Sequence, residues 1–92
     1  MKARPDHLSA LLADRGRTHG DFALQARIAQ AIEAIMAMPE SNWGSLSAPQ
    51  REALGLIATK IGRILAGDPD HADHWRDIAG YAQLVADTLR QR

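Results

Sequence analysis

Apolar residues recur along the chain at spacings of three and four, the period of an α-helix, and no segment alternates in the way that a β-strand does. One short segment and three long ones carry this period. We expect helices at residues 6–15, 21–38, 47–66 and 70–90. The pattern therefore predicts an all-α fold, a four-helix arrangement in a single domain over residues 1–92.

Residues that begin or end helices stand at the edges of these segments. Gly16 is expected to end the first helix in a left-handed conformation. Asp21 can cap the second helix, and Pro39 prevents it from continuing. Residues 47–50, Ser-Ala-Pro-Gln, have the pattern of a capping box with proline in the first turn, and Gly67 follows the third helix.

The third predicted helix carries a stripe of small residues at Gly55, Ala58 and Gly62. Glycine inside a helix costs roughly 1 kcal/mol relative to alanine, so this stripe indicates that another backbone approaches closely. The fourth helix has its expected core face at Trp75, Ile78, Ala82, Val85 and Leu89. Because a chain this short buries only about 60–65% of its unfolded surface, we expect a homo-dimer or a higher homo-oligomer.

The link between the third and fourth helices is short and predicts an antiparallel hairpin with a definite register. Counting outward from this link, the facing pairs are Arg63 with His74, Lys60 with Asp77 and Leu56 with Tyr81. Glu52 lies further along, near Val85. At 1.5 Å per residue, Glu52 should stand on the order of 12 Å from Asp77 along the helix axis.

Composition excludes several classes of function. The 92 residues include 11 basic and 11 acidic side chains, so no net charge attracts DNA or anionic lipid. The absence of cysteine excludes a disulfide scaffold, a thiolate zinc site and a cysteine nucleophile. No signal peptide and no apolar run of membrane-spanning length is visible, so we expect a cytoplasmic protein that does not enter a membrane.

Acids and histidines cluster at the start of the fourth predicted helix. Asp73 and Asp77 are four residues apart on one helix face, and His71 and His74 are three apart. Aspartate oxygens suit Mg²⁺ or Mn²⁺, and imidazole with carboxylate suits zinc. The alternative is that the acids are solvated first-turn residues that favour the helix dipole, with the histidines exposed.

Two cations of the third helix, Lys60 and Arg63, should face these acids. They form inter-helix salt bridges, Lys60 with Asp77 and Arg63 with Asp73, or they form a clamp for phosphate. A second basic segment, residues 15–21, runs into a helix start and could hold an anion through free backbone N–H groups and its two arginines, Arg15 and Arg17. There, the alternative is a plain turn.

Four stretches of the chain resemble a family of small phage and prophage proteins. They are RTHGD at 17–21, QREAL at 50–54, KIGRI at 60–64 and DHWRDIAGYA at 73–82. The family carries a K-I-x-R-I helix and a D-x-W-x-D-I-A-G-Y-A helix. The resemblance covers most of the chain, from Arg15 onward.

That family in turn resembles the all-α nucleoside triphosphate pyrophosphohydrolases of the MazG and dimeric dUTPase type. The resemblance implies a MazG-like arrangement of antiparallel helical hairpins that oligomerisation completes. Those relatives bind magnesium through an E-E-x-x-E run and an E-x-x-D run on adjacent helices. They cleave a nucleoside triphosphate to a monophosphate and pyrophosphate.

The chain departs from these acidic motifs at most positions. Asp77 matches the final aspartate, and His74 stands where the glutamate of E-x-x-D should be. Thr59, Lys60 and Arg63 stand where the three acids of E-E-x-x-E should be. Two ligand positions are therefore reversed in charge, which sets this chain apart from a magnesium site of the relatives' kind.

The leading hypothesis is a phage-derived, MazG-like nucleotide-handling protein, either a pyrophosphohydrolase or a degenerate nucleotide binder. In a hydrolase, Glu52, Asp73 and Asp77 would hold Mg²⁺ or Mn²⁺, and Glu52 and Asp77 would act in catalysis. Glu52 could equally pair with a neighbouring helix or another subunit.

The nucleotide itself would be held by residues outside that carboxylate group, namely Arg17, Lys60, Arg63 and Tyr81. The three cations would neutralise phosphate charge, and the tyrosine would stack on the base. The alternative hypothesis is a non-catalytic helical interaction module, a phage accessory protein whose facing charges are internal salt bridges. A weaker alternative is a metal site at His71 and His74.

Overall fold

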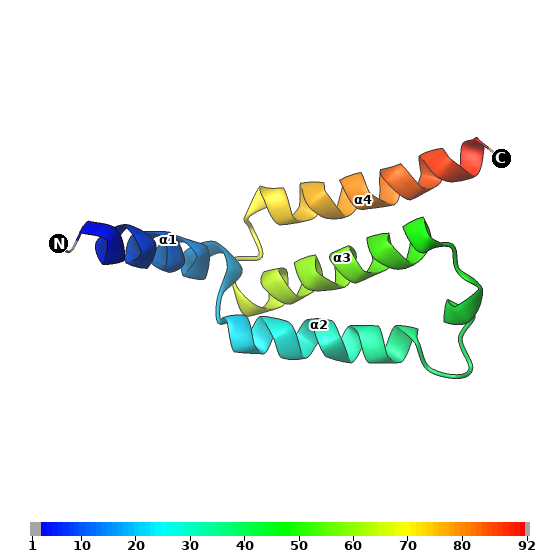
Figure 1. The fold of residues 1–92 in the computed structure, drawn as a ribbon, viewed down its shortest axis with the longest axis horizontal. Coiled ribbons are helices and arrows are strands. Elements are labelled where there is room, and N and C mark those ends of the chain that lie inside the picture. The colour runs from blue at the N-terminus through cyan, green and yellow to red at the C-terminus, as the bar shows by residue number, and fades with distance from the viewer. Residues whose placement is uncertain (1–2, 92) are drawn as a thin grey trace.

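The chain is all-helical in a computed structural model that describes residues 3–91 (Figure 1). Its elements are the helices α1 (Ala3–His19), α2 (Phe22–Met36), α3 (Ala48–Ala66) and α4 (Ala72–Arg90), with a short 3₁₀ turn, η1 (Trp43–Ser45). No strand occurs between residues 3 and 91. The predicted fold class and the number of helices are confirmed.

Helices α2, α3 and α4 form a body, and α1 projects from one end of it (Figure 1). Helix α3 lies between the other two and runs antiparallel to both. Helix α1 meets this body only near its C-terminal end. The radius of gyration is therefore 16.2 Å, whereas a compact chain of this length is expected near ~12 Å. No helix in the described range is long and apolar enough to span a bilayer.

The prediction that Gly16 ends the first helix is wrong. Helix α1 continues through Gly16 to His19, and the glycine in the left-handed region is Gly20, with φ of 76°. A Cβ atom on Gly20 would lie 1.7 Å from the carbonyl oxygen of Ala66, whereas one on Gly16 would meet nothing within 4 Å. The chain therefore turns where tertiary contact demands a residue without a side chain.

The capping residues of the other helices behave as expected. Asp21 accepts a hydrogen bond from the backbone N–H of Ala23 at 3.3 Å. The Ser47 hydroxyl accepts from the Gln50 N–H at 3.3 Å, and the Gln50 side chain accepts from the Ser47 N–H at 2.9 Å. This reciprocal pair confirms the capping box and fixes the start of α3.

Close packing of α2 on α3 depends on a glycine of the small stripe. A Cβ atom on Gly62 would lie 2.7 Å from the backbone oxygen of Gln25, so the two backbones are nearly in contact. Ala58 is buried beside it, and Ala29 is buried on the α2 side. A Cβ atom on Gly55 would meet nothing within 4 Å. The predicted close approach is therefore confirmed at Gly62 but not at Gly55.

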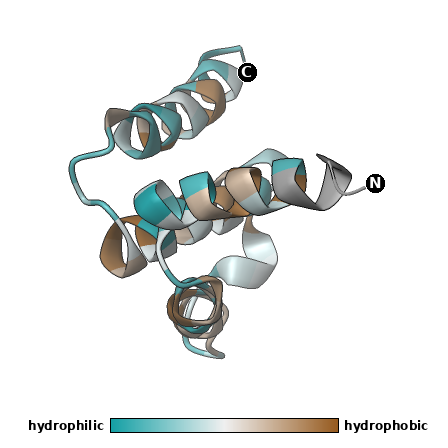
Figure 2. Ribbon diagram, turned by 90° about the vertical axis from the view of Figure 1, so that its left-hand side faces the viewer, coloured by the Kyte–Doolittle hydropathy of each residue, from teal (hydrophilic) through white to brown (hydrophobic). Residues whose placement is uncertain are grey.

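Little apolar surface is buried in the single chain. The buried apolar residues of the described chain are Ala29, Ala53, Ala58 and Ile64. Large apolar residues stand on the surface instead, namely Leu8, Leu11, Leu12, Phe22, Ile35, Met38, Leu54, Leu65, Trp75, Leu84 and Leu89. Helix α2, seen end-on in Figure 2, is hydrophobic around most of its circumference.

Trp75, Ala82 and Leu89 were expected in the core face of the fourth helix, and that expectation is wrong for all three, because each is exposed. Trp75 is 54% exposed, and its indole N–H donates to the backbone oxygen of Pro69 at 2.7 Å. Leu89 is also exposed. Helix α4 packs mainly on α3, with a further contact between its His74 and Thr18 of α1, and this packing leaves Trp75 and Leu89 exposed.

Replacing the two glycines of α3 by alanine should have opposite effects on the free energy of unfolding. Gly62→Ala should lower it by about 1–3 kcal/mol, because the new methyl group collides with the α2 backbone. Gly55→Ala should raise it by about 0.5–1 kcal/mol, because alanine favours the helix and the space is open. Urea denaturation measures both, and equal effects would contradict the packing described here.

Candidate functional site

Two glycine backbones form the junction between α1 and the α3–α4 hairpin. A Cβ atom on Gly67 would lie 2.4 Å from the carbonyl carbon of His19, just as one on Gly20 would collide with Ala66. The backbone oxygen of Thr18 accepts two hydrogen bonds here, one from the Asp68 N–H at 3.2 Å and one involving His74 Nε2 at 3.0 Å. The last turn of α1 is thereby tied to the hairpin link at Asp68 and to the start of α4 at His74.

Three histidines gather over this junction. His74 is only 1% exposed, and its ring centroid lies 4.7 Å from those of both His19 and His71. His19 Nδ1 is 2.6 Å from the Thr18 hydroxyl, with which it hydrogen-bonds. His74 Nδ1 is buried and has no hydrogen-bond partner. The expectation that the histidines are exposed therefore does not hold for His74, the most buried side chain of the site.

The predicted register of the hairpin is confirmed by one ion pair. Lys60 Nζ lies 2.7 Å from an Asp77 carboxylate oxygen, with the Lys60 side chain 12% exposed and that of Asp77 44% exposed. The hydrogen bond from Lys60 lowers the pKa of Asp77 below its usual value, and the charge of Lys60 acts in the same direction. This pair fixes α4 against α3 along their length.

The second pair of the predicted seam is not formed. Asp73 instead accepts a hydrogen bond from Arg76 at 2.9 Å on the exposed face of α4. Arg63 is half-buried, and its Nε is buried without a hydrogen-bond partner. Burial lowers the pKa of Arg63, and the charge of Arg15 lowers it further. The guanidinium thus lacks the carboxylate that the sequence pattern assigned to it.

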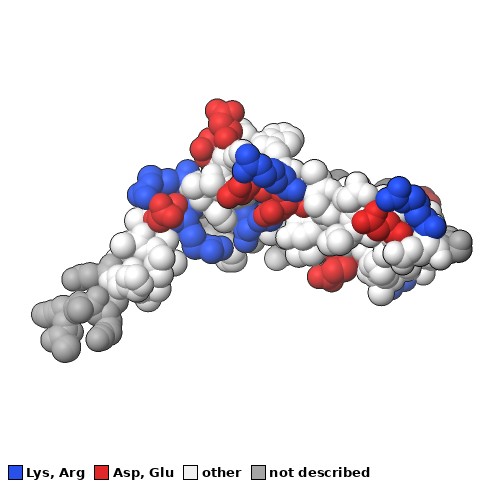
Figure 3. All heavy atoms as spheres, turned by 90° about the horizontal axis from the view of Figure 1, so that it is seen from above, with Lys and Arg blue, Asp and Glu red and all other residues white. Residues whose placement is uncertain are grey.

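Positive charge is in excess around His19. Burial lowers the pKa of His19 to about 4, and the charges of Arg63, His74, Arg15 and Lys60 add to this shift. The carboxylate that faces Arg63 is Asp77, and Asp77 already bonds Lys60. Figure 3 shows lysines and arginines gathered, with acids among them, where α1 meets the body. This arrangement can attract an anion.

Arg17, which the sequence pattern assigned to phosphate, points elsewhere. It is exposed and pairs with Asp14 on α1. Arg15 and His19 are four residues apart and so lie on one face of α1. The charge of Arg15 lowers the pKa of both His19 and Arg63, so these members of the basic 15–21 segment are the ones coupled electrostatically to α3. That spacing was the available signal, but the sequence does not show which face of α1 meets the body.

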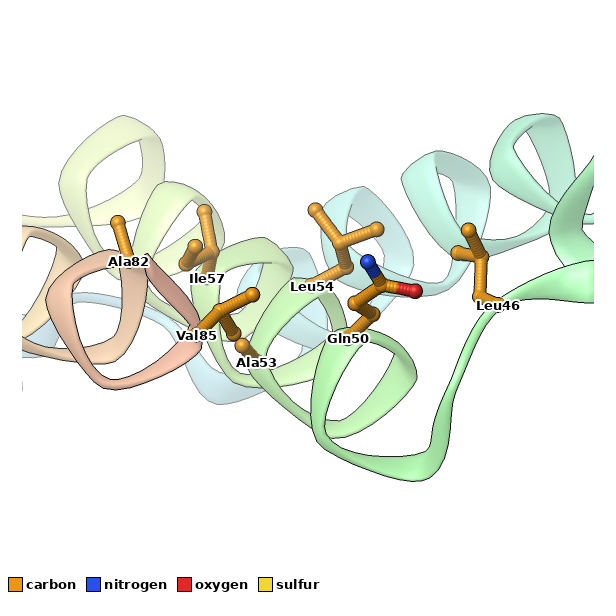
Figure 4. Close-up of a pocket in the computed structure, with 7 residues that line it drawn as sticks. All are labelled: Leu46, Gln50, Ala53, Leu54, Ile57, Ala82 and Val85. Carbon is orange, nitrogen blue, oxygen red and sulfur yellow. The ribbon is translucent and has the colours of Figure 1, made fainter. Parts of the chain in front are cut away.

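Two grooves flank the seam between α3 and α4 beyond the Lys60–Asp77 pair. We name one the tyrosine groove, of about 250 Å³, lined by Pro49, Glu52, Ala53, Leu56, Tyr81, Leu84, Val85 and Thr88. We name the other the leucine groove, of about 300 Å³, lined by Leu46, Gln50, Ala53, Leu54, Ile57, Ala82 and Val85 (Figure 4). Both grooves are mostly apolar. Tyr81 also borders a shallower hollow beside Asp77, so it links the tyrosine groove to the charged part of the seam.

The three carboxylates assigned to a metal do not form one group in the chain. Glu52 lies in the tyrosine groove, Asp77 bonds Lys60, and Asp73 bonds Arg76. Across residues 3–91, no three histidine, aspartate or glutamate side chains are placed to hold a metal ion together, and this includes the histidine cluster. The magnesium or manganese site that the resemblance implies stays a prediction, and the three carboxylates assigned to it have these separate surroundings in the chain.

Fold and site together define a small all-α protein with a basic, histidine-rich junction beside an apolar helical seam. Residues 7–89 match the model of a family described as a domain of unknown function, DUF6378, and the chain belongs to that family. No curated protein and no solved structure matches the chain. The resemblance to phage proteins and to MazG-like enzymes stays a prediction, since the family description assigns no function.

The lowered pKa of His19 predicts a loss of stability in mild acid. The unfolded chain protonates this histidine near pH 6.5, whereas the folded chain does so near pH 4. The unfolded state therefore binds more protons between these values, and stability falls as pH falls through that window. The melting temperature of His19→Gln should therefore fall less between pH 7 and pH 5 than that of the wild type.

The matched control is His7→Gln, which alters an exposed histidine on the same helix. Its melting profile against pH should follow the wild type. Identical profiles for all three proteins would contradict the burial of His19 beside cations.

Proposed function

We propose that this protein handles nucleotides and binds them along the seam between α3 and α4. The observation that carries this proposal is the order of groups on that seam. An apolar groove with Tyr81 comes first, the Lys60–Asp77 pair follows, and Arg63 stands at the end. Leu56 and Arg63 are seven residues apart on α3, which corresponds to roughly 10 Å. A base followed by a chain of phosphates has this same sequence of apolar and anionic parts.

The tyrosine groove supports the base end of the proposal. Tyr81 is half-buried between the groove and the hollow beside Asp77, so its ring has an apolar face available for stacking. Leu56 and Val85 supply the apolar walls, and Glu52 at the rim offers a hydrogen-bond acceptor for an exocyclic amine. Each role follows from the position of the residue along the seam.

The cations support the phosphate end. Arg63 is a half-buried guanidinium with an unpartnered Nε, and guanidinium groups fork onto phosphate oxygens. Lys60 is held in place by Asp77 and can share its three N–H donors between that carboxylate and a phosphate oxygen. Arg15, not Arg17, is the third cation of the proposed site.

We favour nucleotide binding over pyrophosphate hydrolysis within a single chain. A hydrolase of the MazG type needs carboxylates that hold Mg²⁺ or Mn²⁺ together, and Glu52, Asp73 and Asp77 are separately engaged. The resemblance implies either a pyrophosphohydrolase or a degenerate nucleotide binder, and of these two we propose the binder.

We also propose that the protein self-associates as a homo-dimer or a higher oligomer. Among the residues that the structure describes, three of the four buried apolar ones are alanines, and the leucine stripe of α1 is exposed. Apolar burial contributes about 25 cal/mol per Å², so leaving many large side chains exposed forfeits much of the available stabilisation. A second copy could cover these surfaces and complete the four-helix arrangement.

The alternative function is a non-catalytic interaction module. The closed Lys60–Asp77 pair and the apolar leucine groove favour it, because a helix of a partner protein fits an apolar groove without using the cations. Under this alternative, nucleotides do not bind, and the facing charges only hold the hairpin in register.

Nucleotide binding is tested by calorimetry with a panel of nucleoside triphosphates, with and without Mg²⁺ or Mn²⁺. Lys60→Met and Arg63→Met should each weaken binding by roughly tenfold or more, as the loss of a charge-assisted hydrogen bond implies. Tyr81→Leu should weaken the binding of nucleotides but not the binding of tripolyphosphate. Arg17→Met is the matched control, since Arg17 pairs with Asp14, and should bind like the wild type.

The same panel is assayed for pyrophosphate release. Binding without release is expected from the separated carboxylates. No binding by any nucleotide would exclude the proposed function and leave the interaction module.

Self-association is tested by light scattering at micromolar concentration. The wild type should elute above the monomer mass, and the double variant Leu8→Glu/Leu12→Glu should shift toward the monomer, because it places two charges on the exposed stripe of α1. A control double variant, Gln30→Glu/Ala31→Glu, introduces the same two negative charges at exposed positions of α2. A wild type that is entirely monomeric would contradict the proposal.

A further inference from the structure

Three leucines of α1 form an apolar stripe that the rest of the chain leaves uncovered. Leu8, Leu11 and Leu12 are three and four residues apart, so they share one face of the helix, and each is more than half exposed. Helix α1 meets the body only near its C-terminal end (Figure 1). Most helices in proteins owe their stability to the packing of one apolar face. The stripe therefore marks a face on which a partner is missing.

The leucine groove is the middle of a longer apolar face on α3 and α4. Ala82 lines the groove, and Trp75 and Leu89 stand seven residues to either side of it on the same face of α4. On α3, Leu65 is eleven residues, or about three turns, from Leu54 of the groove. All five side chains are exposed. This face has the length of a helix and offers apolar contacts along it.

The accessible surface of the chain is large enough to supply a dimer interface. It measures 6497 Å², whereas a compact monomer of 10.0 kDa is expected to expose about 5,200 Å². The excess is roughly 1,300 Å² per chain, and a standard protein–protein interface buries about 800 Å² on each partner. A second copy of the chain is therefore an occupant of sufficient size.

The leucine stripe and the leucine groove lie at similar distances from the α1 junction. The leucines stand seven to eleven residues before the end of α1 at His19, which corresponds to roughly 10–17 Å. Ile57 of the groove stands ten residues before Gly67, which corresponds to roughly 15 Å along α3. Helix α1 and the body follow one another along the long axis of the molecule (Figure 1). A two-fold axis that crosses this long axis at the junction brings the stripe of one copy level with the groove of the other.

We propose that the leucine stripe of α1 docks in the leucine groove of a second copy, which returns the same contact. Because a two-fold axis makes the exchange reciprocal, the assembly closes as a dimer and does not continue as a filament. The inference rests on the proposed self-association and is independent of nucleotide binding. The tyrosine groove, which flanks the seam separately and has Glu52 in its lining, stays open.

Two double variants test the two halves of this contact. Leu8→Glu/Leu12→Glu alters the stripe, and Leu54→Lys/Ala82→Lys alters the groove, in each case at exposed positions whose replacement leaves the fold of the single chain intact. Each variant alone should have the monomer mass in light scattering at micromolar concentration, because a charge in an apolar contact is costly. Circular dichroism should show the helix content of the wild type for both.

Mixing the two variants in equal amounts should restore the dimer mass. The mixed dimer has one unaltered stripe in one unaltered groove, and in its second contact glutamates meet lysines. A dimer formed by stripe against stripe, or by groove against groove, cannot be restored in this way. A mixture that stays monomeric would overturn the proposal.

The matched control is Leu84→Lys/Thr88→Lys, which places the same two charges on exposed residues of the tyrosine groove and should remain dimeric. A wild type that is entirely monomeric would contradict self-association and this inference together. A dimer that persists in Leu54→Lys/Ala82→Lys would leave self-association standing and overturn the docking of the stripe in the groove alone.

Discussion

The near contact of two glycine backbones, at Gly20 and Gly67, is the constraint on which the rest of the structure depends. It brings the turn after α1 against the link between α3 and α4, and the Thr18 carbonyl then accepts hydrogen bonds from both sides of that link. This contact sets the direction in which α1 leaves the body. It also buries His74 and so determines where the candidate site lies.

Helix α3 connects this junction to the remaining features of the molecule. One face carries Gly62 against α2, and another carries Lys60 and Arg63 toward α4. Because a single helix supplies both faces, the packing of the body and the charge of the seam are not independent. The ion pair at Lys60 satisfies one cation of the seam, whereas the buried Nε of Arg63 has no hydrogen-bond partner.

Local patterns in the sequence were sufficient for the number of helices, the capping box and the hairpin register, but they placed the end of α1 at Gly16 and not at His19. The register follows from a short link and a fixed rise per residue, which is why Lys60 and Asp77 could be paired in advance. Exposure could not be predicted in the same way. Trp75 has core spacing yet is 54% exposed, and of the two arginines in the basic segment Arg17 pairs with Asp14 while the charge of Arg15 acts on Arg63. These outcomes depend on tertiary contacts between distant segments.

The geometry of α1 separates two kinds of surface along one helix. Its last turn contributes to the basic junction, while its leucines stand along an arm that extends away from the body. Substitutions in the arm would therefore act on the proposed self-association and leave the charged junction unchanged, whereas substitutions in the last turn would act on the junction alone. A single helix thus keeps the two surfaces independent of each other in sequence.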